Sequence, residues 1–349
     1  ISYTPQEPDA HQGYKITFTC CPNAVNADRG RRKVEYKMGE DSPVTIKSES
    51  RFKKLLHAYK LEAGMTVILI VLYLVLHLVT GTALKKGNLL NVLQSSAPLL
   101  IMTMGQLVVV ITGGIDLSVG SIYSLSGMCG VLVMLDTQSI AAGVLVALGV
   151  GIVCGLINGV LVAKVKMAPF IVTLAMQGAA ASLTKIIAGG NSQTITLTAF
   201  RAFNRGEMIP GVRNYIIYMI VIVIVMYLLL RKTLLGRWIY ATGSNEEASR
   251  LIGIPVDRVK IICYCMSGFL SAVAALLGAS RLMNVEVTSG VGMELDAIAA
   301  VCIGGASLSG GLGTAFGALV GTLLQKGINN GINLLGINSF WSGAVTGIV

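Results

Sequence analysis

Long apolar runs without charged residues limit the fold of this chain more than any other feature. The stretch from Ser139 to Ala163 holds no Asp, Glu, Lys or Arg, and several other stretches are nearly as apolar. A helix needs about 20 mostly apolar residues to cross the hydrocarbon core of a bilayer. Only 13% of the residues are charged, against about a quarter in soluble domains. The runs are continuous rather than alternating, which argues against a transmembrane β-barrel. The sequence therefore predicts an all-α, polytopic helical membrane protein.

Hydropathy and the positions of Gly and Pro divide the apolar part into about nine or ten membrane segments, including broken or re-entrant helices. The expected segments are Ala63–Val79, Ser96–Thr112, Val119–Leu135, Ser139–Ala163, Pro169–Ala188, Tyr215–Leu230, Ile261–Ala279, Leu295–Gly305, Gly313–Leu335 and Phe340–Val349. The segment 295–305 is too short to span the membrane as a lone helix. The chain stops at Val349 within an apolar run, so we expect the last segment to be truncated.

Basic residues are unevenly distributed between the loops, which predicts an orientation in the membrane. Residues 1–60 are polar and mixed in charge, so we expect a poorly ordered leader ahead of a transmembrane domain at 61–349. The loop 231–260 carries six Lys or Arg residues, and the positive-inside rule places it and the N-terminus in the cytoplasm. The net charge of +10 is then a topology signal and gives no support to a nucleic-acid partner.

The cytoplasmic loop contains its own helix signals. Asn245 is a good helix cap, and Glu246 follows where an acid complements the helix dipole. Gly253 and Pro255 end the pattern, so we expect a helix of about two turns. It is either an ordinary capped loop helix or a short lever that docks on a motor subunit. The residues assigned to it are Gly243, Asn245, Glu246, Glu247, Ala248, Arg250 and Gly253.

Two stretches share a pattern, "ITGGIDLSVG" at 111–120 and "CIGGASLSGG" at 302–311. Irregular backbone is tolerated in a membrane only where protein or a water-filled cavity surrounds it, so both stretches predict helix breaks inside the bundle. Asp116 is expected to cap the following helix. Its charge is either needed for gating, or it is a structural cap that faces cytoplasmic water.

At this point the chain resembles a known family. The stretches "GGIDLSVGS" (Gly113–Ser121), "ELDAIAAVCIGGASLSGGLGT" (Glu294–Thr314) and "NNGINLLGINSFW" (Asn329–Trp341) are similar to the permease subunits of ABC importers for ribose, xylose, galactose and related monosaccharides. The loop helix is similar to the coupling motif of such permeases. The resemblance extends from about Leu61 to Val349.

The resemblance implies a multi-pass protein of the bacterial inner membrane with several partners. Two permease subunits, as a homodimer or heterodimer, would form one pathway. A periplasmic sugar-binding protein would dock outside, and a separate ABC ATPase subunit would hydrolyse ATP inside. The chain itself would then be no enzyme and would need no cofactor or metal. It lacks both the GxxxxGK[ST] phosphate loop and GxSxG.

An ion-coupled secondary transporter of a small polar solute remains the alternative, because broken helices and internal repeats suit that class too. Such a transporter usually has several embedded charges, and the candidates here are few: Asp116, Lys185, Asp296 and Lys326. Polar residues along the spans could line a pathway, although an Asn in a membrane helix more often bonds a neighbouring helix. The residues assigned to the pathway or the helix breaks are Gly113, Gly114, Asp116, Ser118, Asn158, Gly304, Gly305, Ser309, Asn329 and Asn330.

Overall fold

Among the residues that the computed structural model describes, seven helices are long and apolar enough to cross a membrane. The structure describes residues 60–338, 341, 343 and 347. The seven helices are α2 (Lys60–Thr80), α3 (Lys86–Ile111), α4 (Val119–Thr137), α5 (Ile140–Ala163), α6 (Pro169–Ile187), α8 (Asn214–Lys232) and α11 (Val256–Leu282). The predicted all-α polytopic fold is confirmed. The predicted leader up to residue 59 and most of the predicted segment 340–349 lie outside the described residues.

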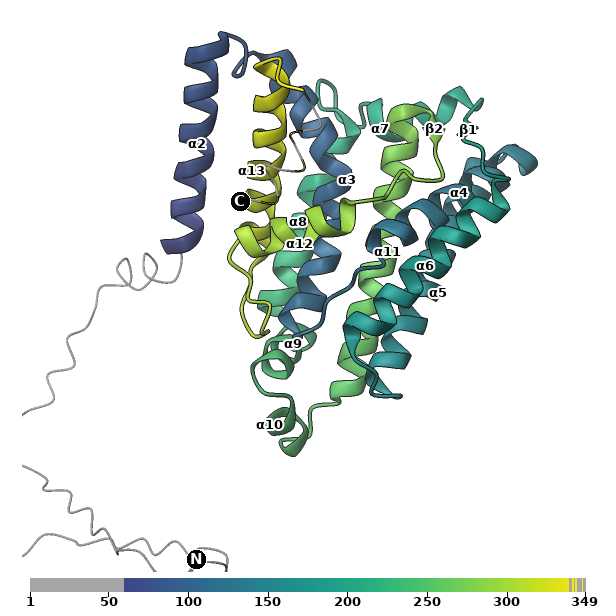
Figure 1. Cartoon of the computed structure of the whole chain (residues 1–349), viewed down its shortest axis with the longest axis vertical. Coiled ribbons are helices and arrows are strands. Elements are labelled where there is room, and N and C mark those ends of the chain that lie inside the picture. Colours follow the sequence, from purple (N-terminus) through teal and green to yellow (C-terminus); the bar gives the residue numbers. More distant parts are fainter. Residues whose placement is uncertain (1–59, 339–340, 342, 344–346, 348–349) are drawn as a thin grey trace, which may run out of the picture. The chain divides into compact units, whose positions relative to one another are not determined.

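Shorter elements connect and complete the bundle. They are β1 (Gln193–Thr194), the 3-10 turn η1 (Thr198–Phe200), α7 (Arg201–Arg205), α9 (Leu234–Ser244), α10 (Glu246–Leu251), β2 (Asn284–Val285), α12 (Met293–Ile303) and α13 (Ala315–Leu334). The strands β1 and β2 pair antiparallel, with Gln193 opposite Val285. Figure 1 shows this ribbon and α7 at one end of the bundle and α9 with α10 at the other. We call these the ribbon end and the α10 end.

Helix α3 lies at the centre of the bundle. Every residue from Ser96 to Ile111 is buried, and α8, α11, α12 and α13 all contact the helix. The prediction began this helix at Ser96, but it begins at Lys86, because its polar first half finds partners within the protein. Asn88 exchanges two amide hydrogen bonds with Asn330, and Gln94 donates to the Asn204 side chain at 2.7 Å.

Glycines bring α5 and α11 into close contact. A Cβ atom on Gly155 would overlap the carbonyl oxygen of Tyr264, and one on Gly151 would overlap that of Gly268. Small residues four apart let membrane helices approach to backbone contact, where packing replaces the hydrophobic effect as the attraction. Helix α11 begins at Val256 rather than the predicted Ile261, because the charges of its first turn are paired with other residues at the α10 end.

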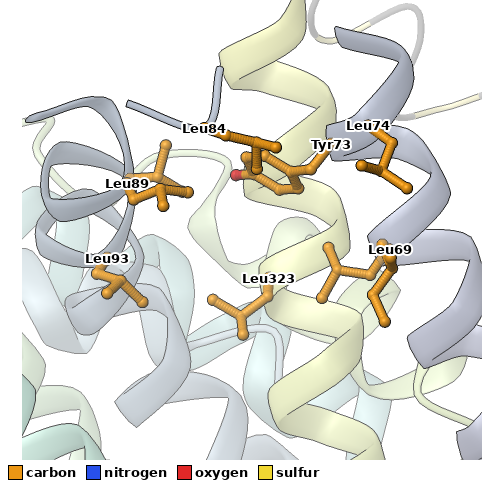
Figure 2. A pocket seen from close by; sticks show the side chains of 9 residues that line it. Leu69, Tyr73, Leu74, Leu84, Leu89, Leu93 and Leu323 are labelled. Atoms are coloured by element: carbon orange, nitrogen blue, oxygen red, sulfur yellow. The ribbon is translucent and has the colours of Figure 1, made fainter. Parts of the chain in front are cut away.

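Helix α2 is the most exposed of the seven spans, because only 6% of the residues in its most apolar stretch are buried within the protein. It contacts α13, where Leu76 packs on Gly331 and Tyr73 on Gly327. An apolar cavity of about 330 Å³ lies between α2, α3 and α13. Figure 2 shows Leu69 and Leu323 on its walls. The rest of α2 exposes apolar side chains such as Val67 and Leu78. This exposure fits a helix that contacts the lipid of the bilayer.

Candidate functional site

Helix α10 has a defined beginning and end. Asn245 has extended backbone, and its side-chain oxygen accepts from the Ala248 N–H at 2.9 Å. At the other end Gly253 adopts a left-handed φ of 85°. The Gly253 N–H donates to the Arg250 carbonyl, and the Ile254 N–H donates to that of Ser249. These two bonds form a Schellman motif, which satisfies the last carbonyls of the helix. The predicted start and end of this helix are therefore present, but Gly243, which was assigned to it, lies in α9 instead.

Charged side chains tie α10 to the rest of the α10 end. Arg250 bonds Glu246 at 2.9 Å and Asp257 of α11 at 2.5 Å. Lys260 bonds Glu246 at 2.6 Å, and Lys166 of the α5–α6 loop bonds Asp257 at 2.7 Å. Burial disfavours the charge on Glu246, but the hydrogen bonds from Lys260 and Arg250 outweigh it and lower the pKa of the carboxyl. We call these five residues the charge network.

The opposite face of α10 has no partner among the described residues. Leu251 is 88% exposed and Ile252 is 76% exposed, and Glu247 and Ala248 are exposed beside them. Two large apolar side chains in water at the tip of a loop are costly unless another protein covers them. We call Glu247, Ala248, Leu251 and Ile252 the α10 face.

The first shared stretch forms a buried network around Asp116, whose side chain is 0% exposed. One carboxylate oxygen accepts from the N–H and hydroxyl of Ser118. The other accepts from the Ser267 hydroxyl of α11 at 2.8 Å. Asn158 of α5 donates to the Ser118 hydroxyl at 2.8 Å. With its amide oriented to satisfy both partners, Gln106 of α3 exchanges two bonds with the Asp116 backbone. The network joins α3, α5 and α11 to the residues that directly precede α4.

The expectation that Asp116 could be a cap facing cytoplasmic water is wrong, because the side chain is fully buried. Asp116 also does not bond the first turn of α4, since its backbone partner is the N–H of Ser118, which directly precedes that helix. This Asx turn fixes the chain direction at the helix start. Sequence reasoning missed Ser267, and nothing in its local sequence distinguishes it from an ordinary helical polar residue.

Both shared stretches are breaks between helices, as predicted, but their glycines are not equivalent. In the first stretch Gly113 has the left-handed conformation, and the Gly114 N–H donates to the Val109 carbonyl. In the second, Gly304 caps α12 and Gly305 has the left-handed conformation. The same Schellman motif therefore falls on the first glycine in one stretch and on the second in the other, so the sequence match is offset by one residue in structure.

The two stretches touch each other. The Gly311 N–H donates to the carbonyl of Ile111 at 2.8 Å, and the Ser309 carbonyl lies beside Gly113. Gly304 packs against Gly317 of α13 so closely that a Cβ atom would overlap the backbone. The glycines and Ser309 of both stretches thus form one region, close to the Asp116 network.

Asn329 and Asn330 lie elsewhere, on α13. Asn330 is occupied by its paired bonds to Asn88, which fits a helix-to-helix contact, whereas the buried Asn329 oxygen has no partner within the described residues. Asp296 of α12 lies 4.0 Å from Lys326 of α13 and accepts from Gln325. Two of the four embedded charges therefore offset each other.

Helices long and apolar enough to span a membrane, a largely buried break after α3, a partly exposed break before α13 and an exposed, doubly capped loop helix are the features of a multi-pass membrane protein. Residues 88–349 match the model of the family described as the permease component of the branched-chain amino acid transport system, and the chain belongs to this family. The family is one of transporter permeases.

Several curated relatives are similar over most of their length. A probable ABC transporter permease of Sinorhizobium fredii is 47% identical over 84% of this chain and 88% of its own. The ribose import permease of Bacillus subtilis is 40% identical, over 82% and 90%. That of Escherichia coli K12 is 36% identical, over 87% and 95%. No solved structure matches. The expected family is confirmed, and these relatives favour an ABC permease over an ion-coupled transporter.

Proposed function

We propose that this chain forms the membrane pathway of an ATP-driven importer for a monosaccharide. A binding protein outside the cell delivers the sugar, and a separate ATPase subunit supplies the energy. The observation that carries the proposal is the α10 face. Its apolar side chains have no partner among the described residues, and the helix that presents them is capped at both ends and anchored by the charge network. The names of the ribose import permeases support the class of substrate.

The orientation follows from the same helix. An ATPase is available only in the cytoplasm, so the α10 end faces the cytoplasm and the ribbon end faces outward. The basic residues of the loop 231–260 lie on this side, in agreement with the positive-inside rule. The N-terminus is then cytoplasmic, and the membrane is the bacterial inner membrane. A second permease subunit, either another copy or a related chain, completes the pathway.

The charge network gives α10 a mechanical connection to the spans. When the ATPases close on bound nucleotide, the α10 face moves with them. Arg250 and Lys260 couple this movement to the first turn of α11, and Lys166 couples it to the loop between α5 and α6. Both connections reach the helices that hold the Asp116 network, which borders the break after α3.

The embedded charges favour a neutral solute over an amino acid, the substrate that the family description mentions. A zwitterion would need counter-charges along its path. Asp296 already has Lys326 within 4.0 Å, and Asp116 is fully buried by hydrogen bonds from two serines. The buried amide oxygens of Asn158, Gln325 and Asn329, which have no partner within the described residues, could accept from the hydroxyls of a sugar.

Reconstitution into liposomes with the ATPase and the sugar-binding protein of the same operon tests the proposal. ATP should drive uptake of labelled ribose or another monosaccharide. Leu251→Asp with Ile252→Asp should abolish co-purification of the ATPase and reduce uptake to background. Leu234→Asp is the matched control, because Leu234 is also exposed but lies outside the α10 face. Uptake driven by an ion gradient without the ATPase, or normal ATPase binding by the double variant, would overturn the proposal.

A further inference from the structure

Three backbone segments meet where α9 ends. They are residues 111–113 after α3, 243–244 at the end of α9, and 310–313 before α13. The hydrogen bond from Gly311 to the carbonyl of Ile111 joins the first and third segments at 2.8 Å. Gly243 lies over this bond, since a Cβ atom there would overlap the Ile111 oxygen and lie 2.6 Å from the Gly311 nitrogen. We call this contact the glycine junction.

Gly310, in the third segment, is equally close to the other two segments. A Cβ atom on Gly310 would lie 2.7 Å from the Gly243 oxygen and 3.0 Å from the Gly113 nitrogen. Gly113, Gly310 and Gly311 also have left-handed φ values of 78°, 87° and 76°, which side chains other than glycine adopt at a cost. The junction is therefore mainly backbone against backbone, and the side chain that enters it is the small Ser244 hydroxyl, 2.6 Å from where a Cβ atom on Gly311 would lie.

Each segment of the junction is followed closely in the chain by another structural feature: α10, the Asp116 network or α13. Only Ser244 and Asn245 separate Gly243 from the first residue of α10. Asp116 and its network follow Gly113 by three residues. On the third segment, Tyr240 of α9 donates its hydroxyl to the Gly313 carbonyl at 2.6 Å. The next residue is Thr314, whose hydroxyl caps α13 by accepting from Gly317.

We propose that the glycine junction transmits movement of α10 to both helix breaks, with Gly243 as its positioning residue. This inference rests on the proposed function, because it assigns a path to the movement that the ATPase starts. Side chains between two elements can absorb a shift by changing rotamer, whereas backbone in contact with backbone cannot. Packed contacts of this kind pass small displacements on rather than damping them. The ends of α3 and α13 must therefore move when the end of α9 moves.

The path is distinct from the charge network. The network connects α10 to α11 and to the α5–α6 loop, whereas the junction connects it to α3, α12 and α13. The junction also explains why the two similar stretches lie together. Each provides the glycine backbone that one side of the α9 end requires.

Two substitutions test the junction in the reconstituted complex. Gly243→Ala puts a methyl group into the contact and should lower the number of sugars imported per ATP at least tenfold. Basal ATP hydrolysis and ATPase binding should not change, because the α10 face is intact. Tyr240→Phe removes one hydrogen bond without changing the packing, and should lower coupling by about fivefold. Gly149→Ala is the control, since Gly149 has nothing within 4 Å of the added atom.

Two measurements, the amount of assembled complex and the number of sugars imported per ATP, distinguish a loss of transmission from a loss of folding or assembly. A merely structural change lowers the amount of assembled complex, whereas the junction predicts normal assembly with a lower ratio of sugar to ATP. If Gly243→Ala does not assemble, Tyr240→Phe alone decides. The inference is wrong if assembled Gly243→Ala or Tyr240→Phe couples like the parent protein. Should the parent itself show no ATP-driven uptake, the proposed function fails instead.

Discussion

Replacing Asp116 separates two roles that a buried carboxylate can have. Asp116→Asn and Asp116→Ala both remove the charge, so any cost of burying that charge cancels when the two variants are compared. Asparagine keeps an oxygen that can accept from the N–H and hydroxyl of Ser118. Its amide nitrogen faces Ser267, whose hydroxyl can accept instead of donating. Alanine keeps none of these partners.

The size of the difference follows from the groups left without a partner. The Ser118 N–H cannot turn away from the empty site, and an unsatisfied buried donor costs about 1–3 kcal/mol. The two serine hydroxyls can rotate toward other acceptors, so they add little. We therefore expect Asp116→Ala to unfold about 2 kcal/mol more easily than Asp116→Asn, with Asn within about 1 kcal/mol of the parent.

Unfolding in mixed micelles with increasing dodecyl sulfate, followed by circular dichroism, measures this difference. Asp136→Ala is the control, because Asp136 is an exposed acid at the end of α4. Uptake by Asp116→Asn in liposomes is measured in parallel. Equal unfolding of the Asn and Ala variants would refute the hydrogen-bond account. A stable Asn variant that no longer transports would show that the charge itself is required for gating.

Two further predictions concern ion pairs. The pKa of Glu246 is lowered in the folded protein, so its stabilisation of α10 is complete at neutral pH and is lost as pH falls through that lowered pKa. A spin label at Ala248 should become more mobile when acidification protonates Glu246, and Glu246→Gln should remove this pH-dependent step. A label whose mobility does not respond to pH would contradict this. Lys326→Met leaves Asp296 without its cation and should destabilise the protein by roughly 1–3 kcal/mol, between the values for exposed and buried pairs. Adding Asp296→Asn should recover part of the loss, and purely additive effects in the dodecyl sulfate titration would exclude an interaction.

The sequence predicted those parts of the fold that depend on local chemistry. The spans α5 and α6 have nearly the expected bounds, because polar or Pro residues end their apolar runs. Helix α10 was predicted from its caps, since Asn245 and Gly253 act within a few residues of the chain. The short α12 was also predicted, because its apolar run is visibly too brief to cross a bilayer.

Contacts between distant segments were not predictable in the same way. The polar residues in the first half of α3 argue against a membrane helix when the sequence is considered alone. In the structure Asn88 pairs with Asn330, which lies more than two hundred residues later in the chain. Ser267 meets Asp116 across 151 positions. The similarity of the two glycine-rich stretches predicted two breaks, but it did not predict that they touch or that their turns are offset by one residue. These features depend on how distant helices pack together, and the residues next to each position in the sequence do not reveal that packing.

The shortness of α12 has a consequence for how the protein enters the membrane. Its 11 residues extend about 16 Å at the rise of an α-helix, roughly half the hydrocarbon thickness. Helix α13 contains Gln325, Lys326 and three asparagines, and it is not among the seven helices that meet the spanning criteria. The insertion machinery has no strong signal in either helix. We therefore expect the chain from 283 to 334 to enter the bilayer against helices already in place, so the glycine-rich contacts that fit α12 and α13 to the bundle form after the preceding spans are inserted.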